Sequence, residues 1–192
     1  MDTYHHKNLK VDLIEAGIAL VAKEGLDGFS LRKVAGLCGV SHAAPYSHFG
    51  NKDRLLEEMQ NYVSENFSAQ LEGTIARCKD KERLLMELGK AYLDFFAARP
   101  NYFAFLFGKS NIALDLTQDA DPQKNYKPYE IFKAAAEDFL ARKNCPKEKR
   151  RDITISLWAF VHGITSLATM RGVKCSFKWE EKIFDFMSAF QF

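Results

Sequence analysis

Apolar residues recur at helical spacing along almost the whole chain. Near the N-terminus, Leu9, Leu13, Ala16 and Leu20 follow one another at intervals of three or four residues, which places them on one face of an α-helix. Comparable spacing returns in most later segments, and we find no convincing run of the apolar/polar alternation that is typical of a β-strand. The pattern predicts an all-α protein.

The first 50 residues contain three predicted helices, at residues 9–24, 31–38 and 42–48. Ser30 and Ser41 directly precede the second and third of these, where a hydroxyl can accept a hydrogen bond from the first turn. Only Gly39, Val40 and Ser41 separate the two short helices. Two helices joined by such a turn form a helix-turn-helix motif, whose second helix enters the major groove of DNA.

Six further helices complete the predicted fold of about nine, at residues 52–78, 81–98, 100–107, 128–143, 147–171 and 178–190. Gly73 marks a point where the first of them can break, and residues 108–127 form a polar, turn-rich connection. We therefore expect a three-helix DNA-binding domain at residues 1–52 and a larger helical ligand-binding and dimerisation domain at residues 53–192.

The position of the charges matters more than their sum, because a formal net charge of +2 does not by itself indicate a nucleic-acid binder. Residues 28–52 contain no acidic side chain. Arg32, Lys33 and Lys52 lie in the first turns of predicted helices, where the helix dipole disfavours a cation by about 0.3 to 1 kcal/mol. Phosphates bound at these helix ends would remove that penalty.

The third predicted helix combines small and polar residues. Ala43 and Ala44 would let the backbone approach base edges, where their methyl groups suit thymine. Ser41 and His42 are placed to contact base edges, whereas Tyr46 and His48 suit phosphate oxygens. In an ordinary helical hairpin Tyr46 and Phe49 would be core residues; we accept this for Phe49 only.

Two runs of sequence, FSLRKVA at residues 29–35 and CGVSHAAPYSHFGNKDRLL at residues 38–56, closely resemble the DNA-binding signature of the TetR family. The resemblance implies a homodimer whose two heads bind successive major grooves of a palindromic double-stranded operator. It carries over Ser30, Ser41, His42, Tyr46, His48 and Lys52 as DNA-contact positions. Pro45 departs from a plain helix, because it forfeits a backbone hydrogen bond. The full set of predicted DNA-contacting residues is Ser30, Arg32, Lys33, Ser41, His42, Ala43, Ala44, Tyr46, His48 and Lys52.

Aromatic residues make up 13% of the chain and gather in its second part. Most aromatic side chains are core residues, but helical bundles also build ligand pockets from them. We expect some of the following residues to line such a pocket: Tyr92, Phe96, Tyr102, Phe103, Phe132, Trp158 and His162. Trp158-x-x-x-His162-Gly163 resembles the pattern that names the WHG-type C-terminal domain of TetR regulators. That resemblance implies a sensor without naming its effector, and for His162 we favour a core position over ligand contact.

The predicted helix at residues 147–171 has two apolar faces, one of which is free to contact something other than its own core. Gly163 in its middle costs about 1 kcal/mol relative to alanine, which suits the close approach of another helix or of a ligand. Paired with residues 178–190 from two subunits, this helix would bury its apolar stripe in a two-fold interface. The residues predicted for that interface are Leu157, Phe160, Ile164, Leu167, Trp179, Ile183, Phe186, Met187 and Phe190.

Other classes of protein lack support in the sequence. No apolar stretch is long enough to span a membrane, so we expect a cytoplasmic protein. The four cysteines are scattered without metal-ligand spacing, and no phosphate loop or catalytic motif occurs, so we expect no metal, no cofactor and no enzymatic activity. The basic run at residues 142–151 is interpreted as a solvated helix end.

The sequence predicts a repressor released by a small, largely apolar or aromatic effector. The alternative is a helical protein that binds apolar ligands without recognising a DNA sequence.

Overall fold

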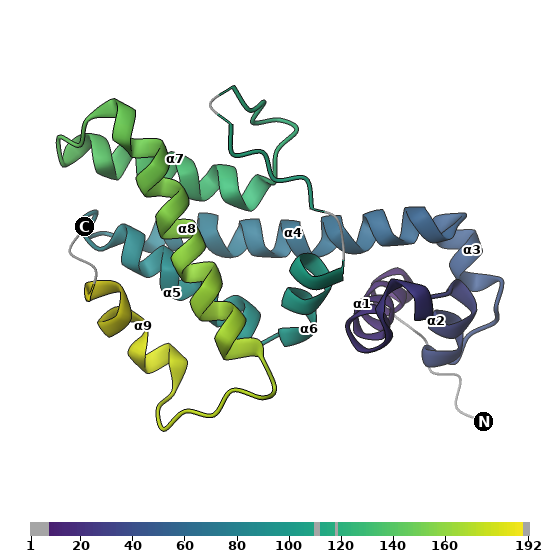
Figure 1. The fold of residues 1–192 in the computed structure, drawn as a ribbon. Coiled ribbons are helices and arrows are strands. Elements are labelled where there is room, and N and C mark those ends of the chain that lie inside the picture. Colours follow the sequence, from purple (N-terminus) through teal and green to yellow (C-terminus); the bar gives the residue numbers. More distant parts are fainter. Residues whose placement is uncertain (1–7, 110–111, 118, 190–192) are drawn as a thin grey trace. The chain divides into compact units, whose positions relative to one another are not determined.

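Helices and the loops that join them make up the part of the chain that the structure describes. The computed structural model describes residues 8–109, 112–117 and 119–189, and within these ranges it contains no strand (Figure 1). The elements are α1 (Leu9–Gly28), α2 (Leu31–Leu37), α3 (Ala44–Phe49), α4 (Lys52–Arg77), α5 (Leu84–Ala97), α6 (Pro100–Phe103), the π-helix η1 (Ala104–Lys109), α7 (Lys127–Arg142), α8 (Lys147–Thr169) and α9 (Trp179–Ser188). The predicted all-α fold is confirmed.

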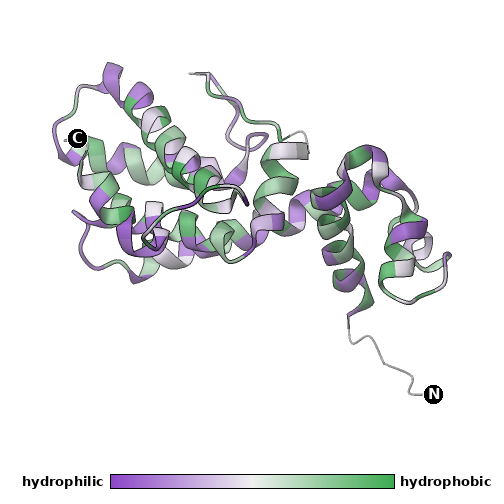
Figure 2. Ribbon diagram, turned by 60° about the horizontal axis from the view of Figure 1, so that its bottom comes forward, coloured by the Kyte–Doolittle hydropathy of each residue, from purple (hydrophilic) through white to green (hydrophobic). Residues whose placement is uncertain are grey.

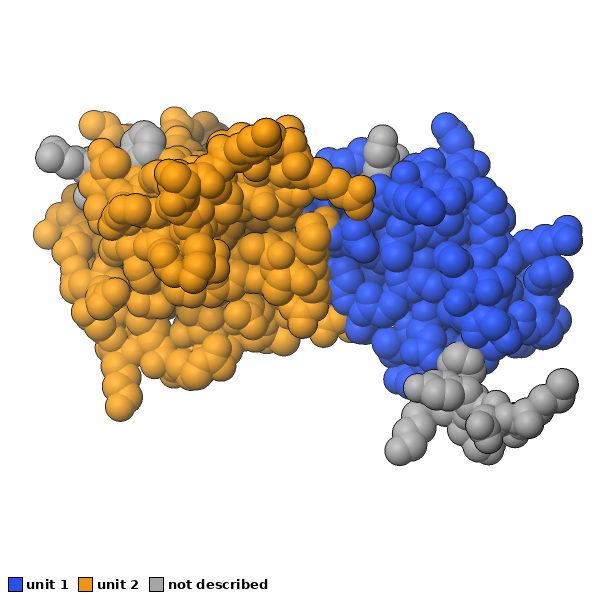
Figure 3. Space-filling model, turned by 90° about the horizontal axis from the view of Figure 1, so that it is seen from below, with its two compact units in different colours: residues 1–63, 101–112 blue, residues 64–100, 113–192 orange. Residues whose placement is uncertain are grey.

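The chain divides into two compact units (Figure 3). Unit 1 comprises residues 1–63 together with residues 101–112, and unit 2 comprises residues 64–100 together with residues 113–192. The division falls inside α4, whose first half belongs to unit 1 and whose second half belongs to unit 2. Unit 1 is therefore built from two segments that are far apart in the sequence.

In unit 1 the helices bury the apolar faces that the sequence pattern predicts. α1 packs against α2 and η1, and α2 packs against α3. Leu55, Met59 and Val63 follow one another every four residues along α4 and are fully buried. Gly17 of α1 lies against α4, because a Cβ atom at this position would be only 2.8 Å from the Met59 sulfur. Glycine thus permits close packing of these two helices.

The start of α3 differs from the prediction of a helix at residues 42–48. The helix begins at Ala44 with Ala43 as its N-cap residue, and no side chain caps it. Ser41 contributes only its carbonyl oxygen, which accepts a hydrogen bond from the Ala44 amide at 3.0 Å. The prediction that Ser41 caps the helix is therefore wrong. Pro45 lies in the first turn of α3, where a missing N–H costs no helical hydrogen bond.

Two other segments also depart from the predicted elements. The helix expected at residues 100–107 ends at Phe103 and continues as the π-helix η1, a rare winding that often occurs near functional sites. α4 continues without interruption past Gly73, where the sequence allowed a break. α1 includes Gly25 at φ 77° and ψ 177°, so its regular part ends near Glu24 as predicted and a short turn follows.

Unit 2 is a helical bundle in which α8 packs against both α5 and α7, and α9 packs against α5. Figure 2 shows apolar and polar residues interspersed along the helices, as expected where each helix buries one face. A Cβ atom at Gly89 of α5 would lie 2.8 Å from the Met187 sulfur and 3.2 Å from a Val161 methyl carbon. Gly89 therefore allows α5 to approach α8 and α9 closely. A Cβ atom at Gly163 would meet no atom of the described residues within 4 Å, so packing among them does not require a glycine there.

Candidate functional site

The turn between α2 and α3 has the backbone geometry of a helix-turn-helix motif. Gly39 lies in the turn at φ 65°, and Gly50 ends α3 at φ 77°; both are left-handed conformations that favour glycine. The Ser30 hydroxyl accepts a hydrogen bond from the Lys33 amide at 3.3 Å, which confirms Ser30 as the N-cap of α2. These local features hold two short helices together within unit 1.

The helix-turn-helix presents a polar surface to solvent around α3. Ser41, His42, Ala43, Tyr46 and His48 are exposed, and Ala44 is half-buried. The other side of α3 faces the core, where Pro45 and Phe49 are buried. Tyr46 is 54% exposed, so it is not a core residue, whereas Phe49 is one as predicted. Every predicted contact residue on α3 and in the preceding turn is thus at least partly accessible.

The two predicted phosphate-binding lysines already have partners within the chain. The Lys33 ammonium lies 2.8 Å from Glu24 Oε2 and donates a hydrogen bond to the Gly28 carbonyl oxygen at 2.8 Å. The Lys52 ammonium donates to the Leu26 carbonyl oxygen at 3.1 Å. Both lysines therefore bind the C-terminal end of α1.

These contacts stabilise the two lysines in a way not predicted from the sequence, besides the phosphates expected there. The Leu26 and Gly28 carbonyl oxygens, in the turn that follows the regular part of α1, and the Glu24 carboxylate supply the negative charge that attracts these cations. The carboxyl end of α1 thus stabilises Lys33 and Lys52 without any phosphate. Arg32 is exposed and has no ion-pair partner among the described residues. The lysine positions alone therefore do not demonstrate a DNA-binding surface.

We expect that replacing Glu24 by glutamine will strengthen DNA binding a few-fold. The Lys33 ammonium holds the pKa of Glu24 below its usual value, so this carboxylate is charged at neutral pH and competes with phosphate for Lys33. Without this carboxylate, Lys33 is free to contact one further phosphate. The plot of log binding constant against log salt concentration should then become steeper by about one unit of slope. Fluorescence anisotropy titrations at several salt concentrations measure both the affinity for DNA and its dependence on salt. An unchanged slope would show that Lys33 does not face DNA.

Two predicted ligand-binding residues lie in unit 1 and not with the others. The Tyr102 hydroxyl donates a short hydrogen bond to Glu15 Oε1, and the Tyr62 hydroxyl donates to the same oxygen at 3.0 Å. Burial, followed by the hydrogen bond to Glu15, raises the pKa of Tyr102 far above its usual value. Phe103 is buried in the same unit and packs against Phe107, with 5.0 Å between ring centroids.

Sequence reasoning missed Glu15 because its partners are remote in the chain. Tyr102 is 87 residues away, beyond the reach of any helical spacing rule. The available signal was a carboxylate beside the buried stripe of α1, where Leu13, Ile14 and Ile18 lie. A half-buried charge in such a place requires hydrogen-bond donors.

The remaining predicted aromatic residues come together in unit 2. Trp158 lies at their centre, and its ring centroid is 5.1 Å from that of Tyr92, 5.3 Å from Tyr129 and 5.4 Å from Phe132. Phe96 joins through Tyr92 at 5.1 Å. We call the rings of Tyr92, Phe96, Tyr126, Tyr129, Phe132 and Trp158 the aromatic cluster. Its side chains fill the space between the helices by contacting one another.

Three members of this region were missed. Phe67 of α4 packs against the cluster, with its ring centroid 4.9 Å from that of Tyr92 and 4.9 Å from that of Phe96. It continues the buried spacing of α4 by four residues from Val63, a signal that was available in the sequence. Tyr126 and Tyr129 flank the start of α7, where the sequence gives no direct indication that they face Trp158.

His162 is a half-buried residue with a hydrogen-bond partner. Its Nδ1 lies 2.9 Å from the Tyr92 hydroxyl. Burial lowers the pKa of His162 below its ordinary value of 6.5, and burial also raises the pKa of Tyr92 well above its usual value. Both groups are therefore neutral at pH 7, which fits the core position that the sequence favours for His162.

Replacement of His162 by glutamine should flatten the dependence of stability on pH. Folded His162 resists protonation, whereas the unfolded chain binds a proton below about pH 6.5, so the free energy of unfolding falls as the solution becomes more acidic. Glutamine keeps a partner for the Tyr92 hydroxyl and does not titrate. Urea unfolding between about pH 5 and pH 7 measures the slope. Equal slopes for both proteins would contradict this account.

The predicted interface residues fall into two groups. Ile183 is fully buried and Leu157 is 6% exposed, both within the core of their own chain, so they offer a partner almost no surface and we remove them from the predicted interface. Phe160, Ile164, Trp179, Phe186 and Met187 are half-buried, and Leu167 is 44% exposed. Phe190 lies outside the described residues.

Two other kinds of feature are missing from the described residues. None of the described helices is both long and apolar enough to cross a lipid bilayer. The same part of the chain holds no group of three or more His, Cys, Asp and Glu side chains arranged to bind a metal ion.

An all-helical protein with an exposed helix-turn-helix and a separate helical bundle belongs to a recognisable class of transcription regulator. Comparison with known families gives the family. Residues 13–59 match the family described as "Bacterial regulatory proteins, tetR family", and residues 85–189, more than half of the chain, match "Tetracyclin repressor-like, C-terminal domain". The chain belongs to the TetR family of transcription regulators.

Individual relatives agree with this assignment. An uncharacterised HTH-type transcriptional regulator of Bacillus subtilis, YerO, is 33% identical over 89 residues, which cover 45% of this chain and only 31% of that relative. A solved protein of unknown function from Rhodococcus is similar with a TM-score of 0.74 and 23% identity, over 98% of this chain and 96% of the other. The regulator FadR of Bacillus subtilis, solved with stearoyl-CoA, is similar with a TM-score of 0.70 and 15% identity, over 93% of this chain and 95% of the other. The two structures show a shared fold.

Proposed function

We propose that this regulator binds a palindromic double-stranded operator as a homodimer, represses transcription, and leaves the DNA when a small, largely apolar or aromatic effector binds. The observation that supports the DNA-binding part is the accessible surface formed by α3 and the turn before it. Ser41 and His42 of the turn and Tyr46 and His48 of α3 are exposed, and Gly39 sets the left-handed backbone of the turn. Residues 1–52 act as the DNA-binding domain and residues 53–192 as the ligand-binding and dimerisation domain.

The dimer interface is proposed on the apolar residues of α8 and α9 that their own chain leaves accessible. These are Phe160, Ile164, Leu167, Trp179, Phe186 and Met187. Exposed apolar side chains on neighbouring elements favour association, and a two-fold interface places the same surface on both subunits. Gly163 lies on α8 among these residues, and the space beside its Cα is open as far as the described part of the chain reaches, which suits the approach of a second helix.

Changing Leu167 to glutamate should convert the dimer to a monomer. The side chain is 44% exposed in the chain, so the charge should leave the fold intact, whereas a desolvated, unpaired carboxylate at an interface is strongly unfavourable. Light scattering after size-exclusion chromatography gives the mass. Leu114→Glu, at a leucine that is 37% exposed in the loop before α7, is the matched control and should stay dimeric. A dimeric Leu167→Glu would place the interface elsewhere.

The effector is proposed to enter the aromatic cluster of unit 2. The FadR chain of the same fold was solved with stearoyl-CoA, so the fold can accommodate a ligand with a long apolar part. Two DNA-bound heads must be spaced about 34 to 36 Å apart, or a multiple of this. An effector that disfavours this spacing releases the operator, and DNA in turn weakens effector binding by the same factor.

Selection of bound fragments from genomic DNA, followed by anisotropy titrations against salt, tests the DNA-binding part. We expect one or a few palindromic fragments, bound far more tightly than unrelated DNA of equal length. Binding that depends on salt but not on sequence would favour the alternative, a helical protein that binds apolar ligands without recognising an operator. The contacts of Lys33 and Lys52 within the chain are compatible with this alternative, because they stabilise the two lysines without DNA.

A further inference from the structure

A groove in unit 2 collects positive charge beside the aromatic cluster. Its volume is about 670 Å³, and its lining comes from α7, from the start of α8 and from Thr117 in the loop before α7. Four cations line it, Lys133, Lys147, Arg150 and Arg151, against two carboxylates, those of Glu137 and Glu148. The lining residues therefore carry an excess of positive charge, which Glu130 and Asp152 next to the lining reduce by pairing with Lys133 and Arg151. The sequence pattern assigns this basic run only a structural role.

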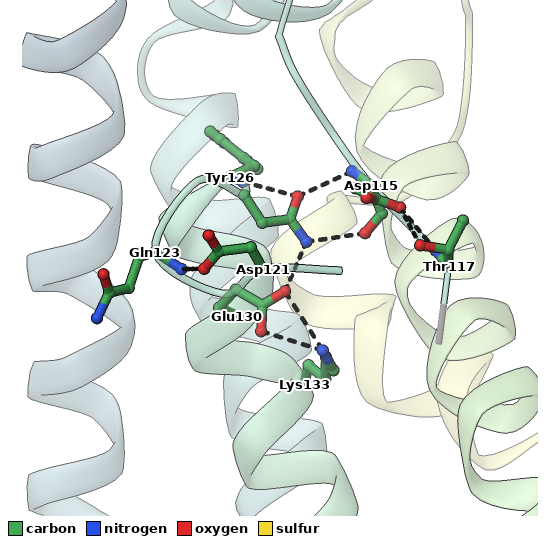
Figure 4. Close-up of polar contacts among 8 residues, drawn as sticks. Asp115, Thr117, Asp121, Gln123, Tyr126, Glu130 and Lys133 are labelled. Carbon is green, nitrogen blue, oxygen red and sulfur yellow. Dashed lines mark hydrogen bonds and ion pairs between the residues drawn. The ribbon is translucent and has the colours of Figure 1, made fainter. Parts of the chain in front are cut away.

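One wall of the groove is fixed by hydrogen bonds (Figure 4). Lys133 pairs with Glu130 at 3.1 Å, and Glu130 also accepts a hydrogen bond from the Asn125 side chain at 2.5 Å. Asn125 binds the Asp115 carbonyl oxygen at 2.8 Å, and Asp115 accepts from the Thr117 hydroxyl at 2.7 Å. This network joins the loop to the first turns of α7, so that Thr117 and Lys133 hold defined positions at the groove.

The other wall keeps charge available for a ligand. Arg150 Nε donates to the Cys145 carbonyl oxygen at 2.9 Å and has no carboxylate partner among the described residues. Lys147 likewise forms no ion pair within the described ranges. Arg151 contacts the exposed carboxylate of Asp152 through Nε at 3.1 Å. A bound anion would thus find cations that the chain itself does not neutralise fully.

A single face of α8 connects the groove with the aromatic cluster. Lys147, Arg151, Thr154 and Trp158 follow at intervals of four, three and four residues, which aligns them along the helix. Trp158 lies seven positions after Arg151, which corresponds to a rise of about 10 Å along the helix. Thr154 lies between them, is only 2% exposed, and its hydroxyl has no hydrogen-bond partner in the described part of the chain. A buried hydroxyl without a partner is rare and calls for an explanation.

We propose that this face of α8 binds an organic anion: an acidic group in the groove, a hydrogen-bonding atom at Thr154 and an apolar body at the aromatic cluster. The ligand class is an acidic amphiphile with about 10 Å between its charge and its rings or chain. The inference rests on the proposed function, since it narrows the effector to this class. The apolar body enters by displacing Tyr126, which precedes α7. Its ring centroid lies 6.5 Å from that of Trp158, farther than the centroids of Tyr92, Tyr129 and Phe132.

The test uses two fluorescent probes that differ in charge. 6-(Dansylamino)hexane-1-sulfonate carries naphthalene rings, an N–H and a sulfonate at the far end of a six-carbon chain, whereas N-hexyldansylamide has the same rings, N–H and chain without the charge. The chain has two tryptophans, so a Trp179→Phe background leaves Trp158 as the only tryptophan donor when the excitation wavelength is chosen to exclude tyrosine. We expect the sulfonate probe to bind with energy transfer from Trp158.

Three substitutions, made in this background, separate the proposed site from general charge attraction. Lys147→Gln and Arg151→Gln should each lower the affinity for the sulfonate probe by about fivefold, and the affinity for the neutral probe by less than about twofold. Lys149→Gln removes the same charge from the same turn but not from the groove lining, and should change neither. All three residues are exposed, so the variants should fold.

Thr154→Val tests the hydroxyl separately. It should raise the melting temperature, because it removes a buried unpaired polar group, and should weaken both probes about threefold, because both present an N–H. A purely structural threonine would not combine these two changes.

The inference is overturned if no energy transfer from Trp158 occurs. It is also overturned if Lys147→Gln and Arg151→Gln bind the sulfonate probe as tightly as the parent, or if Lys149→Gln lowers the affinity for that probe by as much as they do. None of these measurements involves DNA. A failure here therefore leaves the operator-binding proposal standing, and a failure to select an operator leaves this site standing.

Discussion

Replacing Tyr46 by alanine is expected to weaken binding to a selected operator by roughly ten- to one-hundredfold, the effect of losing one good contact at a protein–DNA interface. The side chain is 54% exposed on α3, so its removal should leave the free energy of unfolding nearly unchanged. The loss would then be specific to DNA. Anisotropy titrations at fixed salt measure it, and thermal unfolding confirms that the variant is folded.

Two controls sharpen this result. Tyr46→Phe retains the ring, so an intermediate affinity would assign part of the effect to the hydroxyl and a phosphate oxygen. Leu37→Ala truncates another exposed side chain of the helix-turn-helix, 62% exposed at the end of α2, and should bind DNA like the parent. If Tyr46→Ala keeps the parent affinity, α3 does not enter the major groove as proposed.

Replacing Phe67 by alanine should lower the free energy of unfolding by about 3 to 5 kcal/mol, the usual cost of emptying a buried phenyl site. The side chain is fully buried, and its ring centroid lies 4.9 Å from Tyr92, 5.0 Å from Phe95 and 4.9 Å from Phe96. Few substitutions in the chain remove so many ring contacts at once. Urea unfolding followed by circular dichroism gives the difference.

Phe67→Leu serves as the conservative partner and keeps the measurement possible if the alanine variant does not fold. Leucine preserves most of the apolar volume of phenylalanine. The free energy of unfolding should therefore fall by at most about half as much as in Phe67→Ala. A loss under about 1 kcal/mol for Phe67→Ala would mean that the aromatic cluster relaxes around the vacated space and is less tightly packed than its ring distances indicate.

Regular helical spacing made most of the fold predictable. The four-residue steps that bury Leu13 in α1 and Met59 in α4 are local properties of one helix face, and so is the glycine turn at Gly39. For the same reason Phe49 was assigned to the core and Tyr46 to the surface. These features need no knowledge of what lies elsewhere in the chain.

Features that depend on distant partners were not predictable. Tyr102 looks like its aromatic neighbours in sequence, yet it binds Glu15 in unit 1, 87 residues away. Lys33 and Lys52 looked misplaced at helix starts, because their compensating carbonyl groups lie at the end of another helix, on Gly28 and Leu26. Sequence rules cover interactions within about one helical turn, and these pairs lie beyond that range.

The discontinuous make-up of unit 1 also bears on how such a protein can be divided or recombined. Residues 101–112 belong to unit 1, although the chain on either side of them belongs to unit 2. A fragment that ends at Val63 would lack Tyr102, Phe105 and Leu106, which are buried in the intact chain, and would strip Glu15 of one of its two phenol donors. Exchanging the DNA-binding half between relatives by a single crossover would break the same contacts. A working chimera therefore has to carry both segments of unit 1 from the same parent.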